Sequence, residues 1–356
     1  MQRARFDAAP TVVGSFPHSD PDRLIGRILA TLPELPAWPQ MPARDWIESM
    51  YVQYSEGLPG VTIDRESQKI WFRTDERFQQ ELEGFYQAIV DEDVERFAVS
   101  REYALGLHAF LERVEQIGAG RPQWIKGQVT GPFSFAMTVT DENKRAMAYT
   151  PELYEVAVQG MAMKARWMAR RLLETAPNAI VVLDEPYLCS FGSAFVNVAR
   201  EDVVGMIDSA VEAVHKEGAL AGLHCCGNTD WSLVLATGVD VVNFDAYEYF
   251  QGLSLYPVEL KAFFERGGIL SWGIVPTTRS MSEFTPQGLL EKLEGHMNAL
   301  AGKGVDRTLL FRQSLLTPSC GMGTQTVDGA GHVLSVLSEV ASRFREREAR
   351  SALQTR

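Results

Sequence analysis

Short apolar runs rich in β-branched residues alternate along this chain with longer amphipathic stretches. Such runs predict strands of a sheet that is covered on both faces, because branched apolar side chains pack well there. The clearest runs span residues 11–16, 123–131, 179–186, 220–226, 239–246, 268–276 and 307–316, with a weaker candidate at 50–57. The stretches 151–176, 200–219 and 285–304 have the period of amphipathic helices.

Strands that alternate with helices predict a parallel sheet built from βαβ units. About eight strand runs favour a closed (β/α)8 TIM barrel over an open sheet. The chain has no tandem repeat, low-complexity segment or Pro- or Ser-rich linker, so we expect residues 1–356 to form one domain. Residues 57–75 fit the alternation poorly, and their Pro-Gly turn and β-like SQKIWF run predict a hairpin excursion near the barrel mouth.

The charge and hydropathy of the chain exclude several classes of partner. Acidic residues number 46 against 34 basic ones, for a formal net charge of −12. Such a surface repels phosphate backbones, so we expect no nucleic-acid partner. No window approaches the ~20 apolar residues of a membrane span, and MQRARFDAAP at the start lacks the apolar stretch of a secretory signal. These features predict a cytoplasmic protein with no membrane partner.

Polar or reactive residues end nearly every predicted strand. They are Ser15, Gln128, Asp184 with Glu185, His224 with Cys226, Asp245, and Cys320 just beyond the last strand. In a (β/α)8 barrel the carboxyl ends of the strands form the active-site face. The pattern therefore predicts one shared site at that end of the barrel.

The strand end at residues 220–226 carries a candidate metal site. His224 and Cys226 are two residues apart and point to the same face of a strand, whereas Cys225 points to the other face. Cys320 offers a third ligand, and two sulfurs with one imidazole suit zinc. Three protein ligands with one exchangeable position are typical of catalytic zinc. The alternative, that these cysteines are small buried apolar residues, stays open.

Five stretches carry a family resemblance in their order along the chain: VVGSFP, KGQVTGPFSF, LDEP, LHCCGN and LTPSCGMGT. In this order the chain resembles the C-terminal catalytic barrel of cobalamin-independent methionine synthase, within the wider uroporphyrinogen-decarboxylase-like superfamily. The resemblance implies Zn²⁺ held by His224, Cys226, a later Glu and Cys320. The Glu most similar in placement is Glu248, and Asp245 is a competing carboxylate.

The resemblance also implies a homocysteine pocket. Its amino acid end would be held by Gly14 and Ser15 after the first strand and by Asp184, and Glu56 lies where the family has a substrate-binding Glu. Asp184 and Glu248 are the expected catalytic residues, and a zinc-bound thiolate would take up the methyl group. Structural roles for Ser15 and Asp184 remain open. The inward-facing pair Lys126 and Gln128 is assigned to the pocket without a defined role.

Two departures from the family bear on the methyl donor. The chain lacks the N-terminal barrel that helps the full-length enzymes bind folate, and its segment SWGIVPTTRSM has no His, with Arg279 as its only basic residue. We therefore expect a methylated corrinoid as donor. Because the chain has no Asp-x-His-x-x-Gly corrinoid signature, the corrinoid is expected on a partner protein.

Alternative functions differ in acceptor or in class. Coenzyme M or another thiol could replace homocysteine as the methyl acceptor. A decarboxylase like uroporphyrinogen decarboxylase would need arginines to bind several carboxylates, and the Arg-rich N-terminal motif expected there is not visible. A non-catalytic zinc-binding accessory protein would keep the metal ligands, but it would not need an amino acid pocket.

Overall fold

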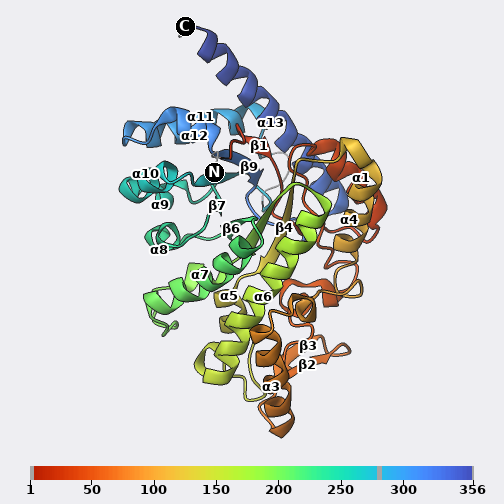
Figure 1. The fold of residues 1–356 in the computed structure, drawn as a ribbon. Coiled ribbons are helices and arrows are strands. Elements are labelled where there is room, and N and C mark those ends of the chain that lie inside the picture. Colours follow the sequence, from red (N-terminus) through yellow and green to blue (C-terminus); the bar gives the residue numbers. More distant parts are fainter. Residues whose placement is uncertain (1–3, 279–282, 355–356) are drawn as a thin grey trace.

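The computed structural model describes residues 4–278 and 283–354 of the chain. Its centre is a curled sheet of parallel strands (Figure 1), and seven strands belong to it in the described residues, in the order β1-β9-β8-β7-β6-β5-β4. They are β1 (Ala9–Pro10), β4 (Trp124–Thr130), β5 (Asn178–Asp184), β6 (Leu220–Cys225), β7 (Val241–Phe244), β8 (Ile269–Val275) and β9 (Ser314–Pro318). The predicted α/β class and parallel sheet are confirmed.

Alternation along each strand separates two apolar layers. One set of side chains forms a small cluster that includes Ile180, Val182, Val241, Ile269 and Leu315. The residues between them belong to the large cluster under the helices. Because successive side chains point to opposite faces, the inner series of a strand continues from apolar residues to the polar residues at its carboxyl end.

The two edges of the sheet are linked by the segment 36–40. On one side Lys126 exchanges two backbone hydrogen bonds with this segment. On the other side the Gln40 amide donates to the Gly14 carbonyl at 3.0 Å, and the Phe16 amide donates to the Gln40 carbonyl at 2.8 Å. These contacts are isolated bridges, so the described strands do not by themselves establish a closed eight-stranded barrel.

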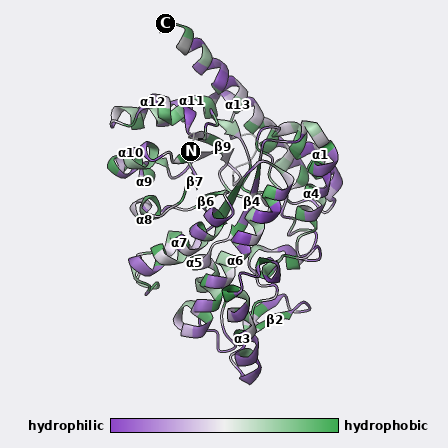
Figure 2. Cartoon of the chain, viewed as in Figure 1, coloured by the Kyte–Doolittle hydropathy of each residue, from purple (hydrophilic) through white to green (hydrophobic). Residues whose placement is uncertain are grey.

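Helices surround the sheet, and hydrophilic and hydrophobic residues alternate along them (Figure 2). The helices predicted at 151–176, 200–219 and 285–304 are present as α6 (Pro151–Thr175), α7 (Arg200–Lys216) and α11 (Pro286–Gly302). Among the described residues, no helix is both long and apolar enough to cross a membrane. The helices are α1 (Pro21–Thr31), α2 (Met50–Gln53), α3 (Glu76–Val90), α4 (Leu105–Ile117), α5 (Pro132–Thr138), α6 (Pro151–Thr175), α7 (Arg200–Lys216), α8 (Trp231–Ala236), α9 (Phe250–Leu253), α10 (Pro257–Glu265), α11 (Pro286–Gly302), α12 (Arg307–Arg312) and α13 (Val327–Gln354).

The predicted hairpin is also present. Strands β2 (Val61–Asp64) and β3 (Lys69–Phe72) pair antiparallel in a separate sheet. The Phe72 amide donates to the Thr140 carbonyl at 2.9 Å. The hairpin is therefore attached to the connection that follows the carboxyl end of β4.

Three of the predicted strands differ in the structure. Residues 50–57 are predicted to include a weak strand, but they begin as helix α2, which Ser49 precedes. The run 307–316 divides into α12 and β9, because the Asp306 side chain accepts hydrogen bonds from the amides of Thr308 and Leu309 and starts a helix there. The first predicted run, residues 11–16, contains no regular strand. The strand at this place in the chain is β1, which ends at Pro10.

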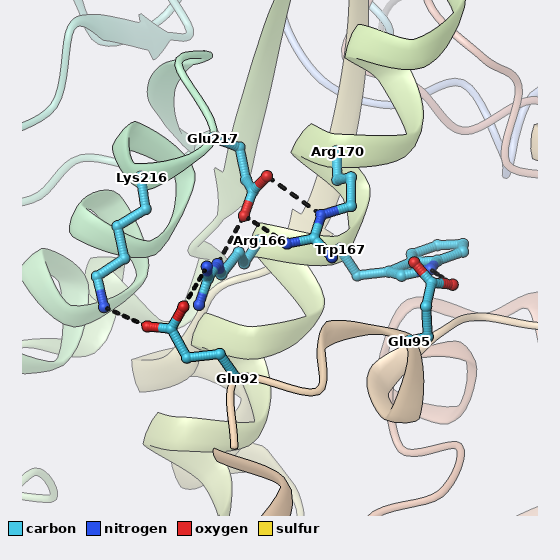
Figure 3. A network of polar contacts seen from close by, with 7 residues as sticks. All are labelled: Glu92, Glu95, Arg166, Trp167, Arg170, Lys216 and Glu217. Carbon is cyan, nitrogen blue, oxygen red and sulfur yellow. Dashed lines mark hydrogen bonds and ion pairs between the residues drawn. The ribbon is translucent and has the colours of Figure 1, made fainter. Parts of the chain in front are cut away.

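A network of ion pairs joins α6 to its neighbours (Figure 3). Arg166 donates to Glu217 at 2.7 Å and to Glu92 at 3.1 Å, and Arg170 also donates to Glu217. Glu217 directly follows α7, and Glu92 lies just beyond α3. The network thus connects the segment 57–97, which includes the hairpin and α3, to helices α6 and α7.

Candidate metal centre

Three residues that could hold a metal ion meet at the carboxyl ends of the strands. His224 lies near the end of β6, Cys226 follows that strand, and Cys320 lies just beyond β9. One ligand atom from each lies within 4.8 Å of the other two. Ligand atoms bound to zinc at about 2.0–2.3 Å in a tetrahedral site are roughly 3.3–3.8 Å apart. The described side chains therefore fit a zinc ion with little movement.

The His224 imidazole is poised for a ligand. It is only 4% exposed, and neither ring nitrogen has a hydrogen-bond partner in the described part of the chain. A buried polar atom without a partner is unfavourable, so a bound cation would satisfy one of these nitrogens. Burial opposes a charged imidazole, but the neighbouring Cys226 thiol and Asp184 carboxylate outweigh it and raise the pKa of His224.

The two thiols of the cluster act as a pair. The contact with Cys226 lowers the pKa of Cys320, and the same contact raises the pKa of Cys226. The reason is that a second thiolate beside the first is unfavourable without a cation. A divalent cation would favour the loss of both protons.

A cavity of about 470 Å³ opens beside the cluster. This volume suits a small organic molecule. The lining combines polar groups with an apolar surface and contains Val13, Ser15, Gln40, Pro42, Ala43, Ser49, Met50, Asp184, Pro186, His224, Cys226, Cys320, Gly321, Gly323 and Thr324. Ser15, Asp184 and the three metal-ligand residues, which lie far apart in the sequence, therefore share one cavity wall.

Asp184 is the acidic residue of the described cavity lining. It pairs with His224 across β5 and β6. Its Oδ1 atom is buried and has no hydrogen-bond partner among the described residues. Burial raises the pKa of Asp184, and the nearby charges of His224 and Lys126 act in the opposite direction. An unpaired carboxylate oxygen at a cavity calls for a donor from a ligand.

Gly14 and Ser15 are held by close contacts. Gly14 has a φ of +149°, and a Cβ atom there would lie 2.3 Å from the Gln128 side chain, so only glycine fits. The Ser15 carbonyl accepts from the Met322 amide at 2.8 Å, and its hydroxyl lies 3.4 Å from the Gly323 amide. Ser15 therefore fixes the loop that carries Cys320.

Two predicted carboxylates are not among the described residues that line the cavity. Glu248 is exposed and belongs neither to the described three-residue cluster nor to the described cavity lining. Glu56 accepts a hydrogen bond from the Ser100 amide at 2.7 Å and is likewise outside that lining. Asp245 is 7% exposed, and burial raises its pKa to about 6. The charge of its carboxylate acts against the lowering of the pKa of Cys320.

The remaining predicted pocket residues, Lys126 and Gln128, are buried and contact the segment 13–14. Lys126 is buried and donates to the Val13 carbonyl at 2.6 Å, and burial lowers its pKa to about 8. Gln128 is buried against Gly14. Cys225 lies in the large apolar cluster, as its position in the strand predicted. Arg279 lies outside the described residues.

The sequence did not indicate several lining residues. Gln40 and Ser49 lie outside every predicted strand and helix, and Met50 begins the run 50–57, which is predicted only as a weak strand. The strand prediction for residues 50–57 also misplaced the neighbouring backbone. Only the run of prolines around Gln40 marks that segment as extended, which is a weak signal.

Comparisons with known proteins bear on the fold. No family model and no curated protein sequence matches the chain. A B12-independent methionine synthase from Shewanella sp. W3-18-1, solved in complex with selenomethionine, superposes with a TM-score of 0.56 at 14% identity, over 96% of this chain and 98% of that one. A β-glycosidase from Thermosphaera aggregans (TM-score 0.44, 13% identity, 84% and 80% coverage) and a dihydropteroate synthase from Thermus thermophilus (0.22, 13%, 64% and 86%) are more distant.

The superposition on the methionine synthase confirms the predicted resemblance at the level of the fold. An identity of 14% establishes shared architecture and nothing about the reaction. The function has to be argued from the cavity and its residues.

Proposed function

We propose that this protein transfers a methyl group to a thiol, with homocysteine as acceptor and methionine as product. The observation that carries the proposal is the meeting of His224, Cys226 and Cys320 at a cavity of suitable size. The fold-related enzyme is named a methionine synthase, and its structure holds selenomethionine. That name supports the same product here.

The residues fit Zn²⁺ as the resident metal. His224 would supply a neutral imidazole nitrogen, and Cys226 and Cys320 would supply thiolates, a soft ligand set that zinc accepts. When bound, zinc would lower the pKa of a coordinated substrate thiol so that its thiolate is present at neutral pH. We expect a carboxylate as a further, displaceable ligand, and the burial of Asp245 beside the cluster favours it over Glu248.

The chain's own residues would bind and orient the amino acid. The unpartnered Asp184 oxygen would accept a hydrogen bond from the substrate ammonium. Ser15, which lines the same cavity, and the backbone of the adjacent Gly14 would donate hydrogen bonds to the substrate carboxylate. The apolar part of the lining, which includes Met50 and Pro186, would exclude water from the sulfur. Segment 36–40 would complete the barrel as an eighth strand and hold this wall in place.

We propose a methylated corrinoid on a partner protein as the donor. A methylated folate is the second candidate, because the fold-related enzyme is described as B12-independent. Zinc-loaded protein should be incubated with homocysteine and either methylcobalamin or methyltetrahydrofolate. Methionine from methylcobalamin alone supports the corrinoid donor. Methionine from the folate alone replaces it, and methionine from neither contradicts the proposed activity.

The alternative functions fit the cavity less well. A decarboxylase of polycarboxylates would need cationic side chains, and no Lys or Arg lines the described cavity wall, whereas Asp184 does. A zinc-binding accessory protein would have no use for an unpaired carboxylate beside the metal. Coenzyme M carries a sulfonate, which Asp184 would repel.

A further inference from the structure

Gln40 lies beside Ser15 on the cavity wall. The two residues form a parallel bridge, and paired residues on neighbouring extended segments point to the same face. Both line the cavity, and Gln40 is only 5% exposed. Its backbone is fixed by hydrogen bonds to Gly14 and Phe16. The side chain of Gln40 is therefore part of a rigid wall.

The orientation of the Gln40 amide follows from a chain of hydrogen bonds. The Tyr103 carbonyl can only accept, so the Gln53 side-chain group 2.7 Å from it must be the NH₂. The Gln53 oxygen then faces Gln40, and the group of Gln40 that lies 2.9 Å from it must be its own NH₂. The side-chain oxygen of Gln40 therefore takes part in neither of these two hydrogen bonds. This assignment rests on donor and acceptor chemistry, which allows only one arrangement of the two amides.

The Gln40 oxygen has no hydrogen-bond donor among the described residues. No hydrogen bond of the described residues uses it, and it is not among the described polar atoms that are both enclosed and unpartnered. Gln40 is among the residues that line the cavity, so this oxygen is available to a ligand bound there. Asp184 contributes a carboxylate to the same lining. Two acceptors around one cavity favour a ligand with several N–H donors, such as an ammonium group.

We infer that Gln40 is a specificity-determining residue, whose side-chain oxygen receives the ammonium group of an α-amino thiol. Gln53 is the positioning residue that keeps this oxygen turned to the cavity. The inference deepens the proposed function and rests on it for the identity of the thiol. We expect this part of the cavity to select homocysteine over thiols that carry an anion in place of the ammonium group, because the anion would meet two acceptors and no donor.

The test compares two thiols that differ only in the amine. Homocysteine and γ-mercaptobutyrate share the thiol and the carboxylate, and kcat/KM for each is measured on the zinc-loaded protein with its methyl donor. Gln40→Met has a similar volume and removes the oxygen. It should lower kcat/KM for homocysteine roughly 10–100-fold, as loss of a hydrogen bond to a charged group does. Less than about a twofold change is expected for γ-mercaptobutyrate.

Equal losses for both thiols, or no loss for either, would overturn the inference. Gln79→Met, at an exposed position of α3, serves as the matched control and should change neither value. If Gln40→Met does not fold, a crystal structure of the unaltered zinc protein with L-methionine gives the answer directly. An ammonium nitrogen within about 3.2 Å of the Gln40 oxygen supports the inference, and an ammonium bound elsewhere overturns it. Inactivity of the unaltered protein with both thiols would instead contradict the proposed function.

Discussion

Asp184 and His224 are paired directly across the parallel strands β5 and β6. Both side chains line the cavity, and Asp184 Oδ1 and the two His224 ring nitrogens have no hydrogen-bond partner in the described part of the chain. A ligand bound to the imidazole through a metal would be within reach of the carboxylate. This relationship joins the proposed metal site to the proposed amino acid site.

Asp184→Asn should separate these two sites. The amide keeps the size of the side chain but removes the charge that would pair with the substrate ammonium. We expect KM for homocysteine to rise roughly 10–100-fold, with zinc content unchanged. Steady-state kinetics and metal analysis of the same preparation measure both. Loss of zinc together with homocysteine binding would show that Asp184 supports the fold of the site, and no change in either would remove it from the site.

Cys320→Ala should release the metal. With one of three protein ligands gone, zinc affinity falls because the remaining His224 and Cys226 cannot complete the site. Zinc per chain, determined by elemental analysis after dialysis against a weak chelator, should drop to near zero. Cys189→Ser is the control, because Cys189 is exposed and outside the described cluster. A Cys320→Ala protein that retains zinc would refute the ligand assignment.

Glu48 should make stability depend on pH. It is completely buried, its Oε2 atom has no partner among the described residues, and burial raises its pKa from 4.5 to about 7 despite its contact with Arg44. The folded state therefore holds the proton more tightly than the unfolded state. The resulting stabilisation is present below pH 4.5 and is lost as pH rises to about 7.

Urea titrations of the protein between these pH values measure this contribution. The free energy of unfolding should decline across the window by up to about 3 kcal/mol from this group. Glu48→Gln should flatten that slope, whereas Glu66→Gln, at an exposed position, should leave it unchanged. An unaltered slope in Glu48→Gln would show that Glu48 does not titrate in this range.

The network around Arg166 should matter for stability. The Arg166 side chain is 10% exposed and that of Glu217 is 15% exposed. Removing the cation with Arg166→Ala leaves a mostly buried carboxylate with less compensation and should cost about 2–4 kcal/mol in the free energy of unfolding. The exposed pair of Lys216 and Glu92, 3.9 Å apart, provides the contrast. Lys216→Ala should change stability by less than about 0.5 kcal/mol, and similar effects of the two substitutions would contradict this account.

Much of the sheet could be predicted because buried parallel strands are continuous apolar runs. Strands β4, β6, β7 and β8 each fall within a predicted run, and β5 begins one residue before its run. The failure at residues 50–57 has a tertiary cause: Gln53 donates to the Tyr103 carbonyl and Tyr54 to the Gln128 carbonyl, and these distant contacts override the local preference. The link through residues 36–40 depends on isolated bridges, which leave no periodic pattern.

The residues of the candidate site also divide into those that could be predicted from the sequence and those that could not. His224 and Cys226 could be paired from strand alternation, the strand ends also indicated Ser15, Asp184 and Cys320, and the resemblance gave Ser15 and Asp184 their expected roles. Glu248 could not be placed, because its distance from the strand end depends on the turn that Asp245 begins by accepting the Glu248 amide at 2.9 Å. The role inferred for Gln40 could not be predicted, because the orientation of its side chain depends on Gln53, which in turn donates to the Tyr103 carbonyl.

The most direct test of the account is the formation of methionine by zinc-loaded protein from homocysteine and methylcobalamin, compared with Cys320→Ala under the same conditions. The account predicts methionine from the unaltered protein and a loss of roughly a thousandfold or more in the variant, because thiolate formation at neutral pH depends on the metal. No methionine from the zinc-loaded protein, or equal rates in the two proteins, would contradict it.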